Sequence, residues 1–447
     1  MLAGPRRGVP PGPGGYPFVG AFPMARRDPL AFFESCVRRH GDLVAMRLGA
    51  RRAYLLRHPD HVKHVLQDRA SIYTKGPTAS RVLSLFGDSL TVIDGERWRL
   101  RRRRVQPAFP PSRHAHFASV ISRAVAELLE DWETLAERSE VVDLAGEMRR
   151  LAQTIIIRAC FGDLANGELR TLRHALDVAV AHVDRRLWSP LPWLDIPTSA
   201  GTRGRRAGAE IEACISRATA DARCSGASSG TLLSALLDVQ RAEPLGVDEI
   251  HEEIKAFLFA GHTTTAGALA WTWYLLSEHT EVRALVEQEC AAVLGRRAPT
   301  PDDLPRLGHT RRVIEEALRL YPPTWLTARS PLDDDLLDGY VIPAGALVLL
   351  SPYLTHRHPK FWIDPERFDP DRFVQDRAAM RPAFSYFPFG GGPRRCIGSG
   401  FATIELQVIL ATVAQRFRPT VLPGARVVPV AGLTLRPGAL PARILAR

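Results

Sequence analysis

The sequence predicts a mainly α-helical protein with small β-sheets. Residues 252–277 form the longest apolar stretch, and residues 119–160 are helix-rich with few breakers. Short alternating segments, typical of strands, occur near residues 43–56 and 332–350. With 447 residues the chain is long enough to enclose a cofactor in its core. We expect a single domain over residues 1–447.

Each element follows from the spacing of apolar residues, which recurs every 3.6 residues in helices and every two in strands. Beyond the two helical stretches above, we expect helices at 28–40, 61–67, 210–222, 281–294, 309–321 and 401–415. We expect strands at 43–48, at 52–56 and within 332–350, with turns at Gly339 and at 343–345. Residues 357–386 are rich in Pro, Asp and aromatic side chains, which predicts an ordered meander with little regular structure.

The apolar stretch at 252–277 has two explanations. A transmembrane helix is one, but His262, three consecutive threonines and the lack of a partner span argue against it. A helix buried in a large core is the other. We adopt the buried helix.

The charge of the chain is strongly basic. Its 59 Lys and Arg against 48 Asp and Glu give a net charge of +11, and the lysines are few: Lys63, Lys75, Lys255 and Lys360. Arginines spread over the surface explain most of this charge, while local clusters suit an acidic partner. No recognised nucleic-acid-binding motif accompanies the charge, so we expect no nucleic-acid partner.

The six cysteines form no C-x-x-C pair, which argues against a zinc ribbon or an iron–sulfur cluster. Their scatter through a chain with no signal peptide predicts reduced thiols and a cytoplasmic protein. Residues 1–24 form a leader too rich in Pro and Gly to span a bilayer. We therefore expect no membrane anchor.

Residues Phe387–Gly400 read F-P-F-G-G-G-P-R-R-C-I-G-S-G and place Cys396 behind three glycines and before a helix. Backbone N–H groups and the helix dipole favour a thiolate there, so we expect a depressed pKa for Cys396. A thiolate is an electron-donating iron ligand, and glycines let the backbone approach a flat cofactor. For the cysteine alone, a buried structural thiol is an equal alternative.

The set Phe389, Gly392, Arg394, Cys396 and Gly398 resembles F-x-x-G-x-R-x-C-x-G, the signature of the cytochrome P450 haem-thiolate monooxygenases. The resemblance implies the cytochrome P450 fold, with one haem (heme b, iron protoporphyrin IX) between the long central helix and the cysteine loop. It implies that Cys396 is the axial iron ligand, Phe389 packs near its sulfur, and Arg394 binds a haem propionate.

Other motifs follow in the order of this family. Trp98 and Arg102 share one helix face and resemble its W-x-x-x-R element, which binds a propionate. Without the other motifs, a solvated run of arginines with one anchoring Trp would be the better interpretation. By position, Arg329 looks like another propionate arginine. Two further motifs resemble E-x-x-R and P-E-R-F, which implies a buried network of Glu316, Arg319 and Arg367.

In the long helix, Ala260, Gly261 and Thr264 lie on one side, where small residues would let a flat cofactor approach. A tight helix crossing is the alternative. The segment resembles the family's oxygen-activation motif A-G-x-[D/E]-T, in which Thr264 is the alcohol. Thr263 replaces the acid that relays protons, so we expect water and Thr264 to deliver them; a substrate hydroxyl, or chemistry other than ordinary hydroxylation, are alternatives.

Two segments are candidates for substrate contact. Apolar residues of the irregular stretch 72–92 (Val82, Leu83, Leu85, Phe86 and Leu90) line either a pocket or a satellite core. The apolar, proline-broken stretch 188–197 falls where the family places a mobile lid. Both suggest a hydrophobic substrate.

The resemblance implies a bacterial-type monooxygenase that inserts one atom of dioxygen into a terpenoid, a fatty acid or another secondary metabolite. No redox domain follows in the chain, so electrons would come from a ferredoxin with its ferredoxin reductase, or from a flavodoxin. Residues 99–104 with Arg394 and Arg395 are expected to form the docking face. Two alternatives stay open: a peroxide-using or non-oxygenating haem-thiolate enzyme, favoured by Thr263, and a non-catalytic haem-binding sensor.

Overall fold

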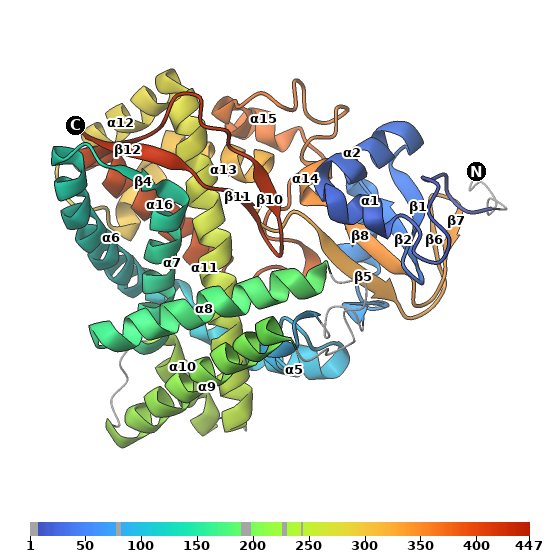
Figure 1. Cartoon of the computed structure of the whole chain (residues 1–447), viewed down its shortest axis with the longest axis horizontal. Helices are drawn as coiled ribbons and strands as arrows, with labels where there is room; N and C mark the ends of the chain where they lie inside the picture. Colours follow the sequence, from blue (N-terminus) through green and yellow to red (C-terminus); the bar gives the residue numbers. More distant parts are fainter. Residues whose placement is uncertain (1–7, 77–81, 189–197, 226–229, 243–244) are drawn as a thin grey trace.

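The structure is a computed structural model that describes residues 8–76, 82–188, 198–225, 230–242 and 245–447. One long helix, α11 (Val247–Glu278), runs through the middle of the molecule, and α8 (Asn166–Leu187) and α9 (Ser199–Ser225) lie across it (Figure 1). All of the expected lid except Trp188 lies outside the described residues.

Helices make up most of the described chain, as the sequence predicts. The remaining helices are α1 (Phe22–Arg27), α2 (Pro29–His40), α3 (Pro59–Lys63), α5 (Gly95–Val105), α6 (His114–Glu137), α7 (Leu144–Phe161), α10 (Leu232–Ala242), α12 (Thr280–Leu294), α13 (Gly308–Leu320), α14 (Pro352–Thr355), α15 (Gln375–Ala379) and α16 (Ser399–Arg416). Asp28 caps α2 by accepting a hydrogen bond from the Ala31 N–H at 3.1 Å.

The strands form small sheets, and the largest has the order β1-β2-β8-β5-β3. Its strands are β1 (Leu43–Leu48), β2 (Arg51–Leu56), β3 (Tyr73–Thr74), β5 (Thr327–Pro331) and β8 (Leu347–Leu350). The others are β4 (Val141–Asp143), β6 (Asp335–Leu337), β7 (Tyr340–Ile342), β9 (Phe417–Val421), β10 (Pro429–Ala431), β11 (Leu435–Pro437) and β12 (Pro441–Ala446). Antiparallel pairing of β3 with β5 sets Thr74 opposite Ser330, so the next residue, Lys75, faces Arg329. This register brings two distant cations together.

The main core lies where α11 packs against α7, α13 and α16 while α6 packs on α7 and α16, and its apolar side chains are almost fully buried. Trp271 of α11 stacks on Tyr321 with ring centroids 3.8 Å apart. Gly261 is needed at the crossing with α7, because a Cβ atom there would lie 2.7 Å from Ile156. The buried-helix interpretation of 252–277 is therefore confirmed, and no described helix has the length and apolar character to cross a bilayer.

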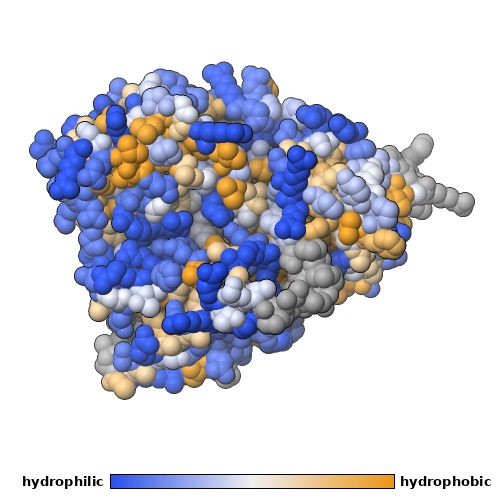
Figure 2. All heavy atoms as spheres, viewed as in Figure 1, coloured by the Kyte–Doolittle hydropathy of each residue, from blue (hydrophilic) through white to orange (hydrophobic). Residues whose placement is uncertain are grey.

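The visible surface is mostly hydrophilic, with hydrophobic residues in small areas (Figure 2). Most arginines beyond the core are exposed or half-buried, in agreement with a basic surface built from scattered charges. Such a surface does not by itself mark a binding site.

Candidate active site

The cysteine loop is a tight turn held by its own backbone. The Cys396 N–H donates to the Phe389 carbonyl at 2.9 Å, and α16 begins three residues later at Ser399. Gly392 has φ +62°, and a Cβ atom there would lie 1.8 Å from the Leu66 carbonyl oxygen. A side chain at this position would push the loop away, so glycine is required for the fold of the loop.

The Cys396 side chain has accessible surface, although the surrounding protein raises the pKa of its thiol by burial. The Gly398 N–H and the charges of Arg102 and Arg395 oppose this shift. The expectation of a depressed pKa is therefore wrong for the thiol without a metal, because desolvation outweighs the helix N-terminus. A thiol loses its proton when it coordinates a metal.

The middle of α11 shows an accessible face within an otherwise buried helix. Ala260 is exposed and Thr263 and Thr264 are half-buried, whereas the neighbouring Phe259 is only 3% exposed. The Thr264 hydroxyl donates to the Ala260 carbonyl at 2.6 Å, and the Thr263 hydroxyl donates to its i−4 carbonyl at 3.2 Å. The helix stays continuous through these bonds. Gly261 does not share this face, since it packs against Ile156 of α7, so the tight-crossing alternative holds for that residue.

Three cations gather near one carboxylate. Arg394 pairs with Asp94 at 2.5 Å, and Arg329 lies close enough to Lys75 to lower the pKa of its ammonium. Burial and the charge of Arg394 lower the pKa of Arg329 to about 10. Burial, with Arg329 and then Arg394, lowers the pKa of Lys75 to about 7. This is a buried site with an excess of positive charge.

The predicted pair on α5 belongs to the same region. The Arg394 guanidinium lies 4.3 Å from the centre of the Trp98 ring, and Trp98 is 9% exposed. Arg102 is half-buried and its charge acts on Cys396. The structure thus brings Trp98, Arg102, Arg394 and Cys396 together, and Arg329 joins them through the cation cluster.

Sequence reasoning missed Lys75. Two features of the sequence could have pointed to Lys75. It is one of few lysines in an arginine-rich chain, and it stands at an irregular stretch. Its ammonium donates to the carbonyls of Leu90 (3.3 Å) and Thr91 (2.5 Å). The β3–β5 register, which places it opposite Arg329, could not be read from the sequence.

These features fit a flat dicarboxylate such as haem. Two propionates would supply the anions that Lys75, Arg329 and Arg394 lack, since Asp94 is the carboxylate paired with this group. The accessible face of α11 and the accessible Cys396 would lie on either side of the ring. The donor set therefore suits haem bound through a thiolate.

A buried ion pair fixes the chain below the cysteine loop. Arg319 donates twice to Glu316, at 2.6 and 2.8 Å, and both side chains are 0% exposed. The prediction that the Arg367 side chain is the third member of this network is wrong. Arg367 is exposed and supplies only its carbonyl to Arg319, while the Arg372 side chain approaches Glu316 at 3.4 Å.

His356 has a structural role beside this network. It is buried and accepts the Phe387 N–H at 2.9 Å.

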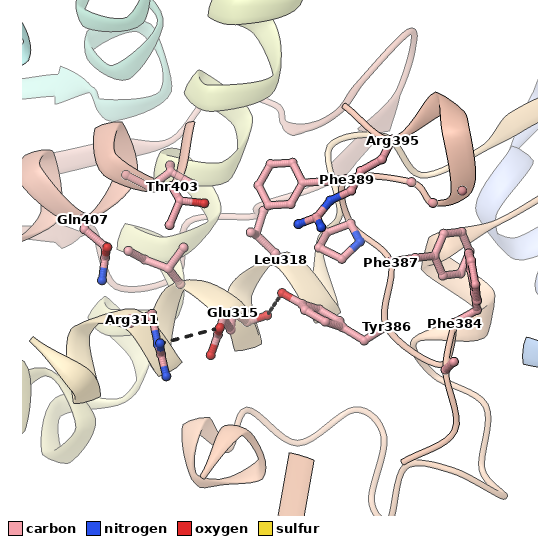
Figure 3. A pocket seen from close by; sticks show the side chains of 17 residues that line it. Arg311, Glu315, Leu318, Phe384, Tyr386, Phe387, Phe389, Arg395, Thr403 and Gln407 are labelled. Carbon is pink, nitrogen blue, oxygen red and sulfur yellow. Dashed lines mark hydrogen bonds and ion pairs between the residues drawn. The ribbon is translucent and has the colours of Figure 1, made fainter. Parts of the chain in front are cut away.

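A pocket of about 480 Å³ lies between α13, α16 and the cysteine loop (Figure 3). Arg311, Glu315 and Leu318 come from α13, Gln407 from α16, and Arg395 from the loop. Its lining includes neither Thr264 nor Cys396, so it is separate from the face of α11 described above.

Comparisons with known proteins place the chain in a family. The family model for cytochrome P450 matches residues 10–438. Cyclooctatin synthase of Streptomyces melanosporofaciens is 38% identical over 96% of this chain and 94% of its own length. Cyclooctat-9-en-7-ol 5-monooxygenase of the same species is 36% identical, covering 92% and 90% of the two chains. Pentalenene oxygenase of Streptomyces avermitilis is 33% identical and covers 97% of each chain.

The fold also matches a solved structure. The retinoic acid-bound cyanobacterial CYP120A1 superposes with a TM-score of 0.87 at 25% sequence identity. The match covers 98% of this chain and 99% of that chain. The arrangement of helices and small sheets is therefore shared along nearly the whole length.

Proposed function

Because this chain belongs to the cytochrome P450 family and is a monooxygenase, we propose that it oxidises a hydrophobic terpenoid. The observation that supports this proposal is the apolar packing directly behind the accessible face of α11, where Phe86 and Phe259 are only 4% and 3% exposed. Phe86 packs edge-on against Phe259 at 4.3 Å, next to Ala260. Two relatives have names that refer to pentalenene and cyclooctat-9-en-7-ol, which are polycyclic isoprenoids.

The cofactor of the family is haem iron, and we assign heme b to this chain. Cys396 is its proposed axial ligand, with Phe389 holding the loop behind the sulfur through the bond to the Cys396 N–H. Haem supplies the activation of dioxygen when it is bound. The propionates are assigned to a set of cations and one indole: Trp98, Arg102, Arg329, Arg394 and, in addition, Lys75.

Thr264 is the proposed proton-handling residue, because its hydroxyl lies on the accessible face beside Ala260. Thr263 lacks a carboxylate, and the hydroxyls of both threonines donate to their i−4 carbonyls, at 3.2 Å for Thr263 and 2.6 Å for Thr264. The pair can pass protons only through hydroxyls and water. This is the basis for a second candidate, an enzyme that uses peroxide, in which turnover would proceed without NAD(P)H.

The electron donor is proposed to be a ferredoxin or a flavodoxin that docks near the cysteine loop. Arg395, Arg99 and Arg103 are exposed and suit an acidic partner. The predicted docking face needs a correction, since Arg101 and Arg394 are turned inward onto carboxylates. A cytoplasmic location is part of the same proposal, and fractionation of the producing cells tests it.

The first experiment is the reduced, carbon monoxide-bound absorption spectrum of the purified protein. The red-shifted Soret band would support a thiolate–iron bond, and a short-wavelength band in fresh protein would overturn the assignment of Cys396. Titration with pentalenene, cyclooctat-9-en-7-ol and dodecanoic acid then compares substrate classes by the change in spin state. A response to dodecanoic acid alone would overturn the terpenoid proposal.

A further inference from the structure

Residues Asp88–Thr91 form a short irregular segment against the first turns of α11. Ser89 is 0% exposed and Leu90 is 8% exposed, whereas Asp88 is exposed and Thr91 is half-buried, so the middle of the segment is buried without the backbone pairing of a helix or strand. Buried backbone groups need partners. Here charged side chains provide them from α11, from Lys75 after β3 and from Arg101 of α5, which donates to the Asp88 carbonyl at 3.5 Å.

Two neighbouring glutamates of α11 accept the N–H groups. The Asp88 N–H donates to Glu252 at 3.0 Å, and the Leu90 N–H donates to Glu253 at 2.9 Å. From the other side, the Lys75 ammonium donates to the Leu90 and Thr91 carbonyls. The segment is thus held between anions on its N–H side and a cation on its carbonyl side.

Glu253 is the buried centre of this arrangement. It is 0% exposed and lies 3.0 Å from Arg101, which is 4% exposed and also contacts Glu249. Burial raises the pKa of Glu253 to about 7, with Arg101 opposing. Burying a carboxylate in such a place lowers the stability of the protein. Its presence there therefore makes Glu253 a candidate for a functional role.

The segment is joined to the substrate face and to the cation cluster. Phe86, two residues before Asp88, packs on Phe259, and Lys75 lies beside Arg329. Phe86 and Phe259 are 4% and 3% exposed, so the side chains that fix the segment fix the apolar layer directly behind the accessible face of α11. The same Lys75 connects that layer to the group assigned to the propionates.

We propose that Glu253, Glu252 and Lys75 are positioning residues that hold segment 88–91, and with it Phe86, against α11 to shape the apolar layer behind the substrate site. This inference rests on the proposed function, because the layer lies behind the haem-facing side of α11. It adds residues that touch neither substrate nor haem iron but decide how well apolar ligands fit.

The test uses Glu253→Met, which removes the acceptor and the charge, and Glu253→Gln, which keeps an acceptor. Arg97→Gln is the matched control, since Arg97 binds the same segment through an exposed ion pair with Asp88. Hydrogen exchange of the Asp88–Thr91 amides is the first readout and requires no substrate. We expect exchange at least about tenfold faster in Glu253→Met, an intermediate rate in Glu253→Gln, and no change in the control.

The second readout compares two ligands of haem iron. Imidazole reports on the iron alone, whereas 4-phenylimidazole also fills apolar space. We expect the affinity for 4-phenylimidazole to fall about tenfold in Glu253→Met while imidazole binding stays within about twofold. If Glu253→Met does not take up haem, Glu252→Ala provides the same comparison. Glu252 is 22% exposed, and its truncation removes the acceptor of the Asp88 N–H and a 3.6 Å ion pair with Arg101 but leaves the buried Glu253–Arg101 pair in place.

Unchanged exchange and unchanged 4-phenylimidazole affinity would overturn the proposal. Equal losses for both ligands would overturn it too, because they indicate general destabilisation. The wild-type reduced carbon monoxide spectrum is measured in parallel. An absent thiolate band would count against the proposed function, whereas the exchange experiment on the segment stands independently of it.

Discussion

Replacing Arg319 by alanine should detach the meander that supports the cysteine loop. Arg319 is 0% exposed and donates to both oxygens of Glu316 and to the carbonyls of His356 (3.0 Å), Pro365 (2.7 Å) and Arg367 (3.1 Å). One side chain therefore joins α13 to two points of the meander and to the turn after α14.

The loss of unfolding free energy in Arg319→Ala follows from the partner groups that the substitution leaves unpaired. A buried carboxylate that loses its partner is destabilised by about 3–5 kcal/mol, and Glu316 belongs at the low end because Arg372 (3.4 Å) and the Asp369 N–H (2.9 Å) remain. Three carbonyls lose a donor, at about 1 kcal/mol each. The sum is about 6 kcal/mol, a large fraction of the 5–15 kcal/mol that stabilises most proteins.

For a chain of 447 residues, an unfolding entropy of about 2.1 cal/mol/K per residue turns this loss into a fall in Tm of about 6 °C. The assay pairs thermal unfolding with haem content per protein, because the meander carries the loop of Cys396. Arg306→Ala is the control, since Arg306 is 61% exposed and 4.0 Å from Asp303, so about 0.5 kcal/mol or less is expected. Arg319→Ala with wild-type Tm and haem content would refute the reasoning.

Four further predictions follow. Cys396→His should still bind haem but lose the red-shifted carbon monoxide band; retention of that band would exclude Cys396 as the ligand. Thr263→Glu should raise product formed per NAD(P)H by no more than about threefold if water and Thr264 suffice, and a gain of orders of magnitude would contradict this. Arg395→Glu should slow reduction by an acidic ferredoxin and weaken its salt dependence; a reduction rate insensitive to salt in the wild type would argue against charge-guided docking. Glu405 is 0% exposed and burial raises its pKa to about 8, so its stabilising contribution is complete below about pH 4.5 and declines up to about pH 8. Glu405→Gln should therefore gain Tm relative to the wild type between pH 5 and pH 8, and a constant difference would contradict the buried acid.

Much of the fold could be predicted from local pattern. Apolar periodicity gave α2 and α16 to within two residues at each end, and the alternating runs gave the β1–β2 hairpin, whose register sets Leu43 opposite Leu56. The expected helix at 210–222 covers only the C-terminal half of α9, because residues 199–209 lack large apolar side chains at helical spacing. The helices α8 and α10 were not expected from the sequence.

The candidate site residues were named mainly from motifs that resemble those of the family. Cys396, Thr264 and the arginines of the motifs stay predictions as haem-binding and proton-handling residues, although the structure brings Trp98, Arg102, Arg394 and Cys396 together. Lys75 could not be named, because its role depends on the pairing of β3 with β5, which joins residues about 250 positions apart. Arg372 could not be told from Arg367 for the same reason: the fold of the meander decides which guanidinium turns inward.

If haem propionates bind the cation cluster as proposed, the amount of this protein in a cell should depend on its cofactor. The charges of Lys75, Arg329 and Arg394 repel one another, so the folded chain would be less stable without the propionates than with them. A ligand that binds only the folded state adds RT ln(1 + [L]/Kd) to its stability. Chains made when haem is scarce would then be the first that proteases remove, and haem supply would set enzyme abundance without any dedicated regulator.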